Sequence, residues 1–379
     1  MKRRIKKSIA LLLTLTLIST IIVVSFISVS AVIYDTGKFQ YSVTGIEGTK
    51  EFEAEVVGYK GDITDSVIKI PSSIDYAEAE SGKSSVIGIG YNAFKEMQNL
   101  TSVSIPETVE TIGYGSFAKT GLKSFTVPST VKSIGDFAFS DCVSLKTINF
   151  GKGVKSLGKY SFIGCNSLET VTLPSNITSI DDACFAQCEN LNSVDLGSVN
   201  EIGDLIFDDC TSLSNVKYSS KLSSVGYMMF NGCTSLSSFT IPEGVTKIDF
   251  GAFKNCTNLK SISLPSTLKE IDYCVFEGCD NLSSITYNGI SSAFSKIKVG
   301  NENGNFTTAR VTYSSSKAAT GINGDANADG KLNISDVTFT QKYIAKTNDE
   351  ISSDADFNKD GKINITDATY MQKSIAKIT

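Results

Sequence analysis

The segment LTSVSIPETVETIGYGSF, residues 100–117, is one unit of an internal repeat, and this repeat decides the fold. It contains a leucine, an alternating Val-x-Ile segment, a turn, a second apolar pair and an Ile-Gly pair that leads to phenylalanine. Alternation of apolar and polar residues predicts a β-strand, and the segment that ends in phenylalanine returns the chain to the next strand. The phenylalanine recurs every 22 or 23 residues, at Phe94, Phe117, Phe139, Phe162, Phe185, Phe207, Phe230, Phe253 and Phe276. We therefore expect nine units that stack into a solenoid, each burying its faces against its neighbours.

The prolines support the same register independently. Each of the six follows the last apolar residue of an alternating segment: Pro71, Pro106, Pro128, Pro174, Pro242 and Pro265. Proline lacks a backbone N–H, so at this position it can end a strand without removing a hydrogen bond from the middle of a ladder.

The residues that flank the central apolar residue of each strand should point outward from the sheet. They read Ser102/Ser104, Ser124/Thr126, Thr147/Asn149, Thr170/Thr172, Ser193/Asp195, Asn215/Lys217, Ser238/Thr240, Ser261/Ser263 and Ser284/Thr286. Such a face of hydroxyl groups either keeps the sheet soluble or forms a shallow polar surface for a glycan or a protein. The candidate ligand contacts are Thr147, Asn149, Thr170, Thr172, Asp195, Asn215 and Lys217.

Catalysis is disfavoured by what the sequence lacks. There is no histidine, the commonest general base, and no tryptophan, the best ring for stacking on sugars. No paired carboxylates converge on the hydroxyl face as glycoside hydrolysis would need. Acidic neighbours such as Asp181-Asp182 and Asp208-Asp209 fall in returning loops, where we expect them to be solvated.

Seven of the nine cysteines lie three residues after a repeat phenylalanine, and Cys184 and Cys274 fall outside this row. In an exported chain the usual inference is disulfides, and strand spacing would allow them. We expect buried free thiols instead, because the count is odd and because Met97 and Thr120 fill the same position in earlier units. A mixed Cys/His zinc site is impossible without histidine, and a linear row does not supply an all-cysteine cluster.

The N-terminus predicts export. Five basic residues precede an apolar run over residues 9–27, and Val29-Ser30-Ala31 provides the small residues of a cleavage site, so residues 1–31 are expected to be a signal peptide. A retained membrane anchor is the alternative. Removing five positive charges and no acidic ones lowers the formal charge from −5 to −10. A chain this acidic is a poor partner for nucleic acid or anionic lipid. We therefore expect it to bind no nucleic acid and, after cleavage of the signal peptide, no membrane.

Two loops near the C-terminus match a calcium-binding pattern. They are DANADGKLNISD, residues 325–336, and DFNKDGKINITD, residues 356–367, and each runs into a short amphipathic segment with no helix expected before it. Oxygen-bearing groups fall at loop positions 1, 3, 5, 7, 9 and 12, which predicts two Ca²⁺ ions. The expected ligands are Asp325, Asn327, Asp329, the Lys331 carbonyl, Asn333 and Asp336, and then Asp356, Asn358, Asp360, the Lys362 carbonyl, Asn364 and Asp367. A standard EF-hand has Glu at position 12, and both loops here have Asp.

These motifs resemble two known families. The Leu, alternating strand and Ile-Gly-x-x-x-Phe-x-x-Cys-x-x-Leu return resemble BspA-like leucine-rich repeats over about residues 55–290, and the duplicated loop-then-helix resembles the dockerin of cellulosomes over about residues 322–379. The resemblance implies an α/β repeat solenoid with a parallel β-sheet on one face, plus a small all-α calcium-binding dockerin that docks onto a scaffoldin cohesin module. Carried over by position, the cohesin contacts are Ile334, Ser335, Gln341, Lys342, Ile365, Thr366, Gln372 and Lys373. Many dockerins have two hydroxyls where Ile334 and Ile365 stand here, which leaves the cohesin type open, and the likeness of the two copies implies that either could face the partner.

The expected domain order after the signal peptide is an N-terminal cap and first atypical repeat (32–75), a solenoid (76–290), a C-terminal cap (291–313), a linker (314–320) and a dockerin (321–379). The expected function is a non-catalytic, secreted, cellulosome-associated or cell-surface protein whose repeats bind a plant polysaccharide or a cell-surface protein. The alternatives are a carbohydrate-active enzyme subunit, a structural spacer with no ligand on the repeats, and calcium loops that only fold the terminal domain.

Overall fold

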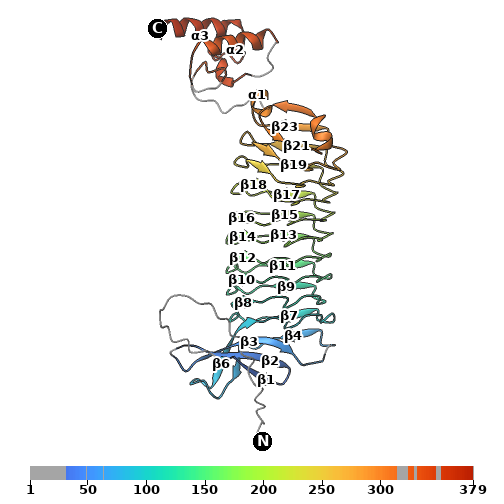
Figure 1. The fold of residues 1–379 in the computed structure, drawn as a ribbon. Coiled ribbons are helices and arrows are strands. Elements are labelled where there is room, and N and C mark those ends of the chain that lie inside the picture. The colour runs from blue at the N-terminus through green and yellow to red at the C-terminus, as the bar shows by residue number, and fades with distance from the viewer. Residues whose placement is uncertain are drawn as a thin grey trace, which may run out of the picture. The chain divides into compact units, whose positions relative to one another are not determined.

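The computed structural model describes residues 31–47, 49–62, 64–313, 323–327, 331–346 and 351–378 (Figure 1). The expected signal segment, apart from Ala31, and the expected linker lie outside the described residues. The chain divides into two compact units, up to Lys217 and from Tyr218 onward. Within the described residues, no helix has the length and apolar character needed to cross a bilayer.

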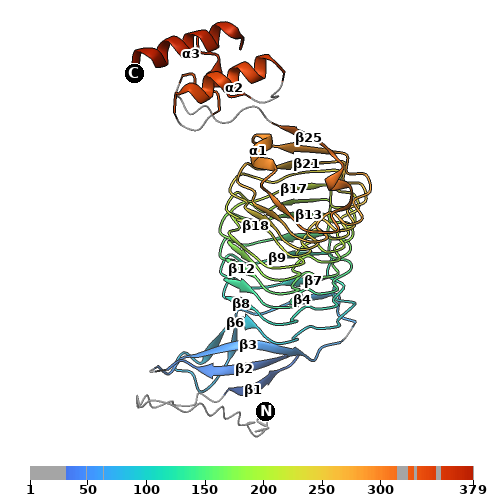
Figure 2. The same cartoon turned by 45° about the horizontal axis from the view of Figure 1, so that its top comes forward.

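The first unit begins with an antiparallel sheet that continues into the repeats. Strands β1 (Val32–Thr36), β2 (Phe39–Gly45) and β3 (Phe52–Tyr59) pair antiparallel, and β3 then pairs in parallel with β6 (Lys83–Ile89). Strand β5 (Ser73–Asp75) pairs with the other side of β6. The N-terminal segment therefore extends a sheet of the repeats and covers its first edge, as Figure 2 shows for the blue strands.

From β6 a ladder of two-residue parallel strands runs through the first unit. Its members are β8 (Thr111–Ile112), β10 (Ser133–Ile134), β12 (Ser156–Leu157), β14 (Ser179–Ile180) and β16 (Glu201–Ile202). Each ends in the aliphatic residue that precedes the return to phenylalanine, and these side chains are buried or half-buried. The sequence did not predict this second ladder, because two residues are too few to show an alternating pattern.

The predicted alternating strands form the face ladder on another side of each coil (Figure 1). They are β4 (Val67–Lys69), β7 (Ser102–Ser104), β9 (Ser124–Thr126), β11 (Thr147–Asn149), β13 (Thr170–Thr172), β15 (Ser193–Asp195) and β17 (Asn215–Lys217). The central residue is buried or half-buried and its neighbours are more exposed, as predicted. Pairing is not continuous, because β4 pairs with β7, β9 with β11, and β13 with β15 and β17.

The second unit repeats this plan. One ladder contains β18 (Ser224–Val225), β20 (Lys247–Ile248), β22 (Glu270–Ile271) and β24 (Lys298–Val299), and the face ladder contains β19 (Ser238–Thr240), β21 (Ser261–Leu264), β23 (Ser284–Tyr287) and β25 (Arg310–Tyr313). Helix α1 (Ser291–Phe294) and the 3-10 turn η1 (Gly304–Thr307) accompany the last strands. Phe306 of η1 stacks on Phe276 at 4.9 Å and so takes the position of one more repeat phenylalanine.

The repeat phenylalanines form the centre of the core. Phe139 and Phe162 stack with 5.2 Å between ring centroids and planes 3° apart, and Phe162 and Phe185 follow at 5.4 Å. These rings are fully buried. Each stacked pair adds roughly 0.5–1.5 kcal/mol beyond the burial of its area, so the strict sequence register reflects a continuous packing requirement.

The cysteine row confirms the expected buried thiols. All nine cysteines are buried thiols that form no disulfide in the described residues. The Cys165 thiol donates a hydrogen bond to the Phe139 carbonyl of the preceding repeat at 3.2 Å, and Cys188 does the same to Phe162. Cysteine suits this position because it is small and apolar enough for the core and still offers one weak donor. Burial raises the pKa of the Cys142 thiol to about 11, which suppresses the reactive thiolate.

The two helices near the C-terminus, α2 (Ile334–Ile344) and α3 (Ile365–Ile378), pack against each other. The 3-10 turn η2 (Ser353–Ala355) lies between them in the chain. Their small core consists of buried residues from both helices and from the segments before them: Ala326, Val337, Ile351, Ala355, Ala368 and Met371. As the sequence predicted, each candidate calcium loop runs into a helix, although each helix begins at loop position 10, three residues earlier than the segments expected at 337–346 and 368–377.

Candidate functional site

The second calcium loop gathers the predicted oxygen-bearing side chains around its turn. Asp356 accepts backbone hydrogen bonds from Asp360 at 3.1 Å and from Gly361 at 2.8 Å, and the Asn358 side-chain oxygen accepts one from Asp360 at 2.9 Å. Asp360 in turn accepts from the Lys362 N–H at 2.9 Å. Gly361 has φ 81°, a left-handed conformation that glycine adopts without steric cost.

The aspartate at position 12 closes each loop and caps the helix that follows. Asp367 is fully buried, and its two oxygens accept from the backbone N–H groups of Asn358 at 3.2 Å and Asn364 at 2.9 Å. Asp336 accepts from Asn327 and Asn333 at 3.2 and 2.8 Å in the first loop. A carboxylate three residues after the N-cap reaches back in this way in a capping box, so an aspartate is long enough for this role.

The asparagines at position 9 are helix N-caps. The Asn333 side-chain oxygen accepts from the Ser335 N–H at 2.8 Å, and Asn364 accepts from Thr366 at the same distance. This oxygen already accepts a hydrogen bond from the helix. The residue at position 9 would therefore contact an ion through a water molecule, which is frequent in such loops.

The donor set fits a hard divalent cation. The second loop contributes the carboxylates of Asp356, Asp360 and Asp367, the amide oxygen of Asn358 and the Lys362 carbonyl, and all of these are oxygen ligands. A fully buried carboxylate such as Asp367 is costly without a compensating charge. In the first loop Asp325 and Asp336 are also fully buried, whereas Asp329 lies outside the described residues.

The predicted cohesin contacts are all exposed on the two helices. Ile334 and Ile365 are 61% and 59% exposed although they are aliphatic, while Val337 and Ala368 of the same helices are buried in the small core. Sequence reasoning missed Tyr370, which is 46% exposed and has the Lys373 ammonium 6.0 Å from its ring centroid.

The structure does not bring the seven candidate contacts of the repeat face together: four line a hollow, two form an ion pair and one is in neither group. Thr147, Asn149, Thr170 and Thr172 line one hollow of about 360 Å³ on β11 and β13, together with Ile148, Phe150 and Pro174. Asp195 and Lys217 instead form an ion pair at 2.9 Å, and this hydrogen bond lowers the pKa of Asp195. Asn215 is exposed opposite Ser193 on the neighbouring strand. The signal that could have indicated Phe150 is local: Phe150-Gly151 stands where most repeats have an aliphatic residue followed by proline.

Comparison with protein families assigns both parts of the chain. The family described as BspA type Leucine rich repeat region matches in six copies over residues 87–205 and 196–299, and the Dockerin type I domain matches residues 323–376. The chain is a BspA-type leucine-rich-repeat protein with a C-terminal type I dockerin. A type I dockerin implies calcium binding, cohesin binding and a cellulosome-like role, and the repeats are an interaction module. The homologues of the repeats are leucine-rich-repeat proteins and not enzymes, and both matched families are typical of extracellular or cell-surface bacterial proteins.

Several solved structures are similar to this BspA-type protein. A leucine rich cell surface protein from Faecalibacterium prausnitzii is 22% identical, with 71% of this chain and 98% of that chain covered and a TM-score of 0.36. A leucine-rich repeat protein from Eubacterium ventriosum is 17% identical, with 72% and 94% covered and a TM-score of 0.41. The leucine-rich repeat protein of T. pallidum is 23% identical, with 66% and 90% covered and a TM-score of 0.40. Among curated proteins, none matches the sequence.

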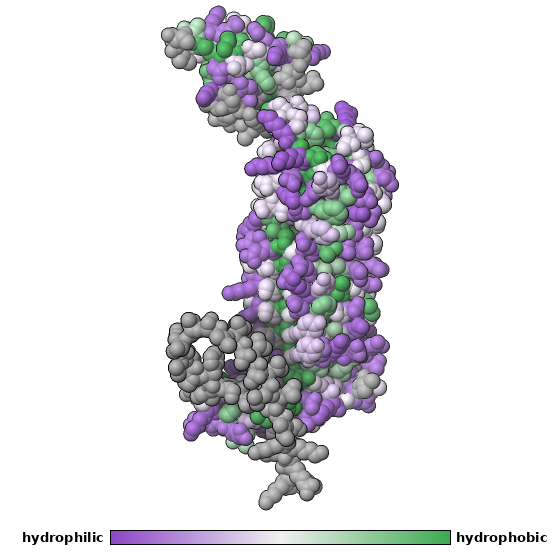
Figure 3. Space-filling model, in the orientation of Figure 1, coloured by the Kyte–Doolittle hydropathy of each residue, from purple (hydrophilic) through white to green (hydrophobic). Residues whose placement is uncertain are grey.

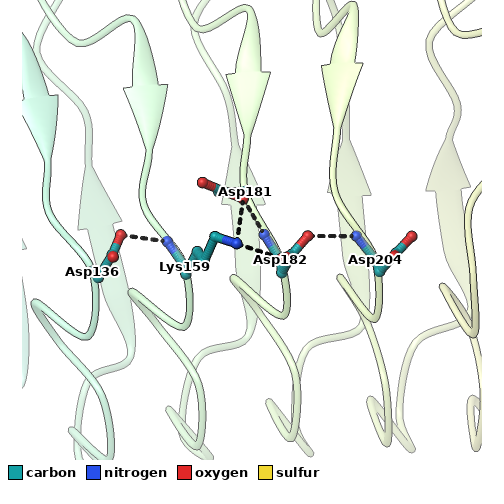
Figure 4. Close-up of polar contacts among 5 residues, drawn as sticks. All are labelled: Asp136, Lys159, Asp181, Asp182 and Asp204. Atoms are coloured by element: carbon teal, nitrogen blue, oxygen red, sulfur yellow. Dashed lines mark hydrogen bonds and ion pairs between the residues drawn. The ribbon is translucent and has the colours of Figure 1, made fainter.

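The acidic pair Asp181-Asp182 of the BspA-type repeats is not simply solvated, which corrects the expectation for these residues. The Lys159 ammonium lies 2.8 Å from an Asp182 oxygen and 3.8 Å from Asp181 (Figure 4). The hydrogen bond from Lys159 lowers the pKa of Asp182, whose other oxygen accepts from the Asp204 N–H of the next coil at 3.0 Å. These carboxylates therefore connect adjacent coils.

Sequence reasoning also missed a row of surface aromatic rings. Tyr91 stacks on Tyr114 with 5.1 Å between centroids, and Phe137 stacks on Tyr160 at 4.8 Å. Each stacked pair covers one face of each of its two rings and joins successive coils, so the row stabilises the stack of repeats. In Figure 3 hydrophobic residues (green) on the visible face of the repeats are interspersed among hydrophilic ones (purple).

Proposed function

We propose that this protein is an exported, non-catalytic subunit of an extracellular complex. Its dockerin, holding two Ca²⁺ ions, docks onto a scaffoldin cohesin, and its leucine-rich repeats form an interaction surface for a polysaccharide or a cell-surface protein. Export through residues 1–31 and cleavage after Ala31 are part of this proposal.

The observation that carries the proposal is the duplicated loop-and-cap arrangement. Both copies use the same N-cap asparagine and the same buried position-12 aspartate, and both place an exposed isoleucine directly after the cap. The calcium set proposed for each ion is the one expected from the sequence, with the lysine carbonyls at position 7. Exposed aliphatic residues beside hydroxyl and amide groups suit a protein partner, since interfaces combine an apolar centre with a polar rim.

The repeat face supports binding rather than catalysis. Its charged candidates Asp195 and Lys217 neutralise each other, and the acidic pair Asp181-Asp182 is engaged by Lys159 and by the backbone of the next coil. No described pair of these carboxylates is available as the acid and nucleophile of a glycosidase. A spacer role remains the competing function, and the hollow on β11 and β13 favours a ligand over it.

The test of docking is retention of the full chain on immobilised type I cohesin modules in calcium and in the chelator EGTA. We expect retention by at least one cohesin in calcium and release in EGTA. Equal retention in both buffers, or no retention by any cohesin of the panel, would overturn the proposed docking.

A further inference from the structure

We propose that the hollow between β11 and β13 binds a neutral saccharide unit. The inference deepens the proposed role of the repeat face as an interaction surface and rests on it. The proposal rests on one observation. Unpaired hydroxyl and amide groups lie beside the Phe150 ring at a break in the face ladder.

The hollow exists because two neighbouring strands separate on one side only. Strand β11 pairs with β9 and strand β13 with β15, and no ladder pairing joins β11 to β13. The Glu169 N–H still reaches the Lys146 carbonyl before these strands, at a long 3.5 Å. On the second ladder of the same coils, β12 and β14 remain paired. The opening is therefore local, and its volume of about 360 Å³ lies in the range of small-molecule sites, which is ~300–1,000 Å³.

The polar groups of the hollow are available to a ligand. Within the described residues, no side-chain hydrogen bond occupies Thr147, Asn149, Thr170 or Thr172, and all four are exposed. Hydroxyl and amide groups can each donate and accept, which matches the hydroxyl groups of a sugar.

One wall of the hollow is apolar. Phe150 is half-buried, and its ring meets Phe162 edge to face, with 5.9 Å between centroids and planes 87° apart. Contact with the buried phenylalanine stack fixes the orientation of the Phe150 ring, so little freedom is lost on binding. Pro174 adds a second rigid apolar surface. The C–H groups of a pyranose ring can pack on such a surface while its hydroxyls face the threonines and Asn149.

Charge decides between ligand classes. All the residues that line the hollow are uncharged, so a carboxylate-bearing sugar would lose hydration there without gaining a partner. A protein partner would need roughly 800 Å² of surface on each side, far more than this small hollow provides. A neutral saccharide therefore fits the site best.

The test uses full-length protein and a substitution at the wall of the hollow. The chain has no tryptophan, so Phe150→Trp introduces a single fluorescent reporter without background. We would titrate this variant with cellohexaose, xylohexaose and mannohexaose, and with hexagalacturonate as the anionic comparison. We expect a saturable blue shift and protection from acrylamide quenching with at least one neutral hexasaccharide and no response to hexagalacturonate. Calorimetry on the unsubstituted protein with the same sugars verifies that the reporter does not create the site.

A matched pair of double variants locates the binding. Thr170→Val with Thr172→Val keeps side-chain size and removes both hydroxyls, so we expect at least a roughly tenfold weaker Kd. Ser238→Ala with Thr240→Val makes the equivalent change on β19, which is paired with β21, and should leave the Kd unchanged. Thermal unfolding of each variant checks that the fold is intact.

Three results would overturn the inference. They are no response to any neutral hexasaccharide by fluorescence and calorimetry, affinity unaffected by the Thr170 and Thr172 changes, and a response only to solubilised bacterial surface protein, which would assign the face to a protein ligand. Docking onto cohesin is measured separately, so saccharide binding without cohesin retention would refute the docking proposal alone.

Discussion

Truncating the exposed isoleucines of the dockerin tests the docking face most directly. Ile334 and Ile365 are 61% and 59% exposed. If a partner covers either side chain, truncation beyond Cβ reduces the apolar surface buried on binding by roughly 70 Å². This loss corresponds to about 1.7 kcal/mol at ~25 cal/mol/Å², or roughly a twentyfold weaker Kd.

The two-fold likeness of the loops makes the single and double variants informative. If either copy can face the cohesin, Ile334→Ala or Ile365→Ala alone removes one of two equivalent binding modes. Each single change should then weaken binding only about twofold, because RT ln 2 is ~0.4 kcal/mol. The double variant should show the full loss of roughly twentyfold, measured by calorimetry of the full chain with a cohesin module in calcium.

Val143→Ala provides the matched control, since Val143 is an aliphatic residue of the repeats that is 55% exposed. It should leave cohesin affinity unchanged. Circular dichroism in calcium should show that all variants keep their helices, because the truncated side chains lie outside the small core. A double variant that binds like the unsubstituted protein would refute the reasoning about the docking face. A full loss from one single variant would show that only one copy docks.

Three further predictions concern the calcium loops and the solenoid. Chelation with EGTA should abolish the helical signal of α2 and α3 and leave the β-signal of the repeats, because buried position-12 carboxylates lose their counter-charge; helicity unchanged in chelator would contradict this. Burial raises the pKa of Cys142 to about 11 and that of Cys184 to about 12, so folding favours the protonated thiols. The free energy of unfolding, followed by urea titration, should therefore be unaffected by these thiols below about pH 8.5 and fall as the pH rises toward those values, and alkylation of the native chain at pH 8 would count against it. Phe162→Ala should lower the free energy of unfolding by about 3–5 kcal/mol and Phe162→Leu by less, since leucine leaves a smaller cavity between the neighbouring rings; equal effects of the two would argue against cavity formation as the cause.

The repeat register, the free thiols and the outward hydroxyl face could be predicted because each follows from a position that recurs. Each coil has the same positions as the next, as Phe162, Cys165 and Thr170 illustrate. The role of a position in one repeat therefore predicts its role in the other repeats. The candidate calcium loops were predictable for a related reason. Their ligand spacing is local, within 12 residues, and does not depend on distant packing.

Other features depended on contacts between coils. Phe137, Tyr160 and Leu205 have φ values of 56°, 56° and 59°, in a left-handed region that glycine usually fills. Hydrogen bonds between successive returns hold them there, such as the Phe137 N–H to the Lys159 carbonyl at 2.9 Å. No pattern in the residues themselves signals this conformation. The pairing of Asp182 with Lys159 is likewise a contact between residues 23 positions apart.

The repeat length, the buried phenylalanine and cysteine rows, the hydroxyl face and the two oxygen-rich loops follow from the linear chain, because side-chain periodicity and local ligand spacing are visible in it. The opening of the face ladder and the pairing of surface charges do not follow from it. They emerge on folding, because strand pairing, ring orientation and ion pairing depend on how neighbouring coils meet. Thr147 and Thr172 are ordinary members of a repeating row in the sequence, and they become the two sides of one hollow only when β11 and β13 separate.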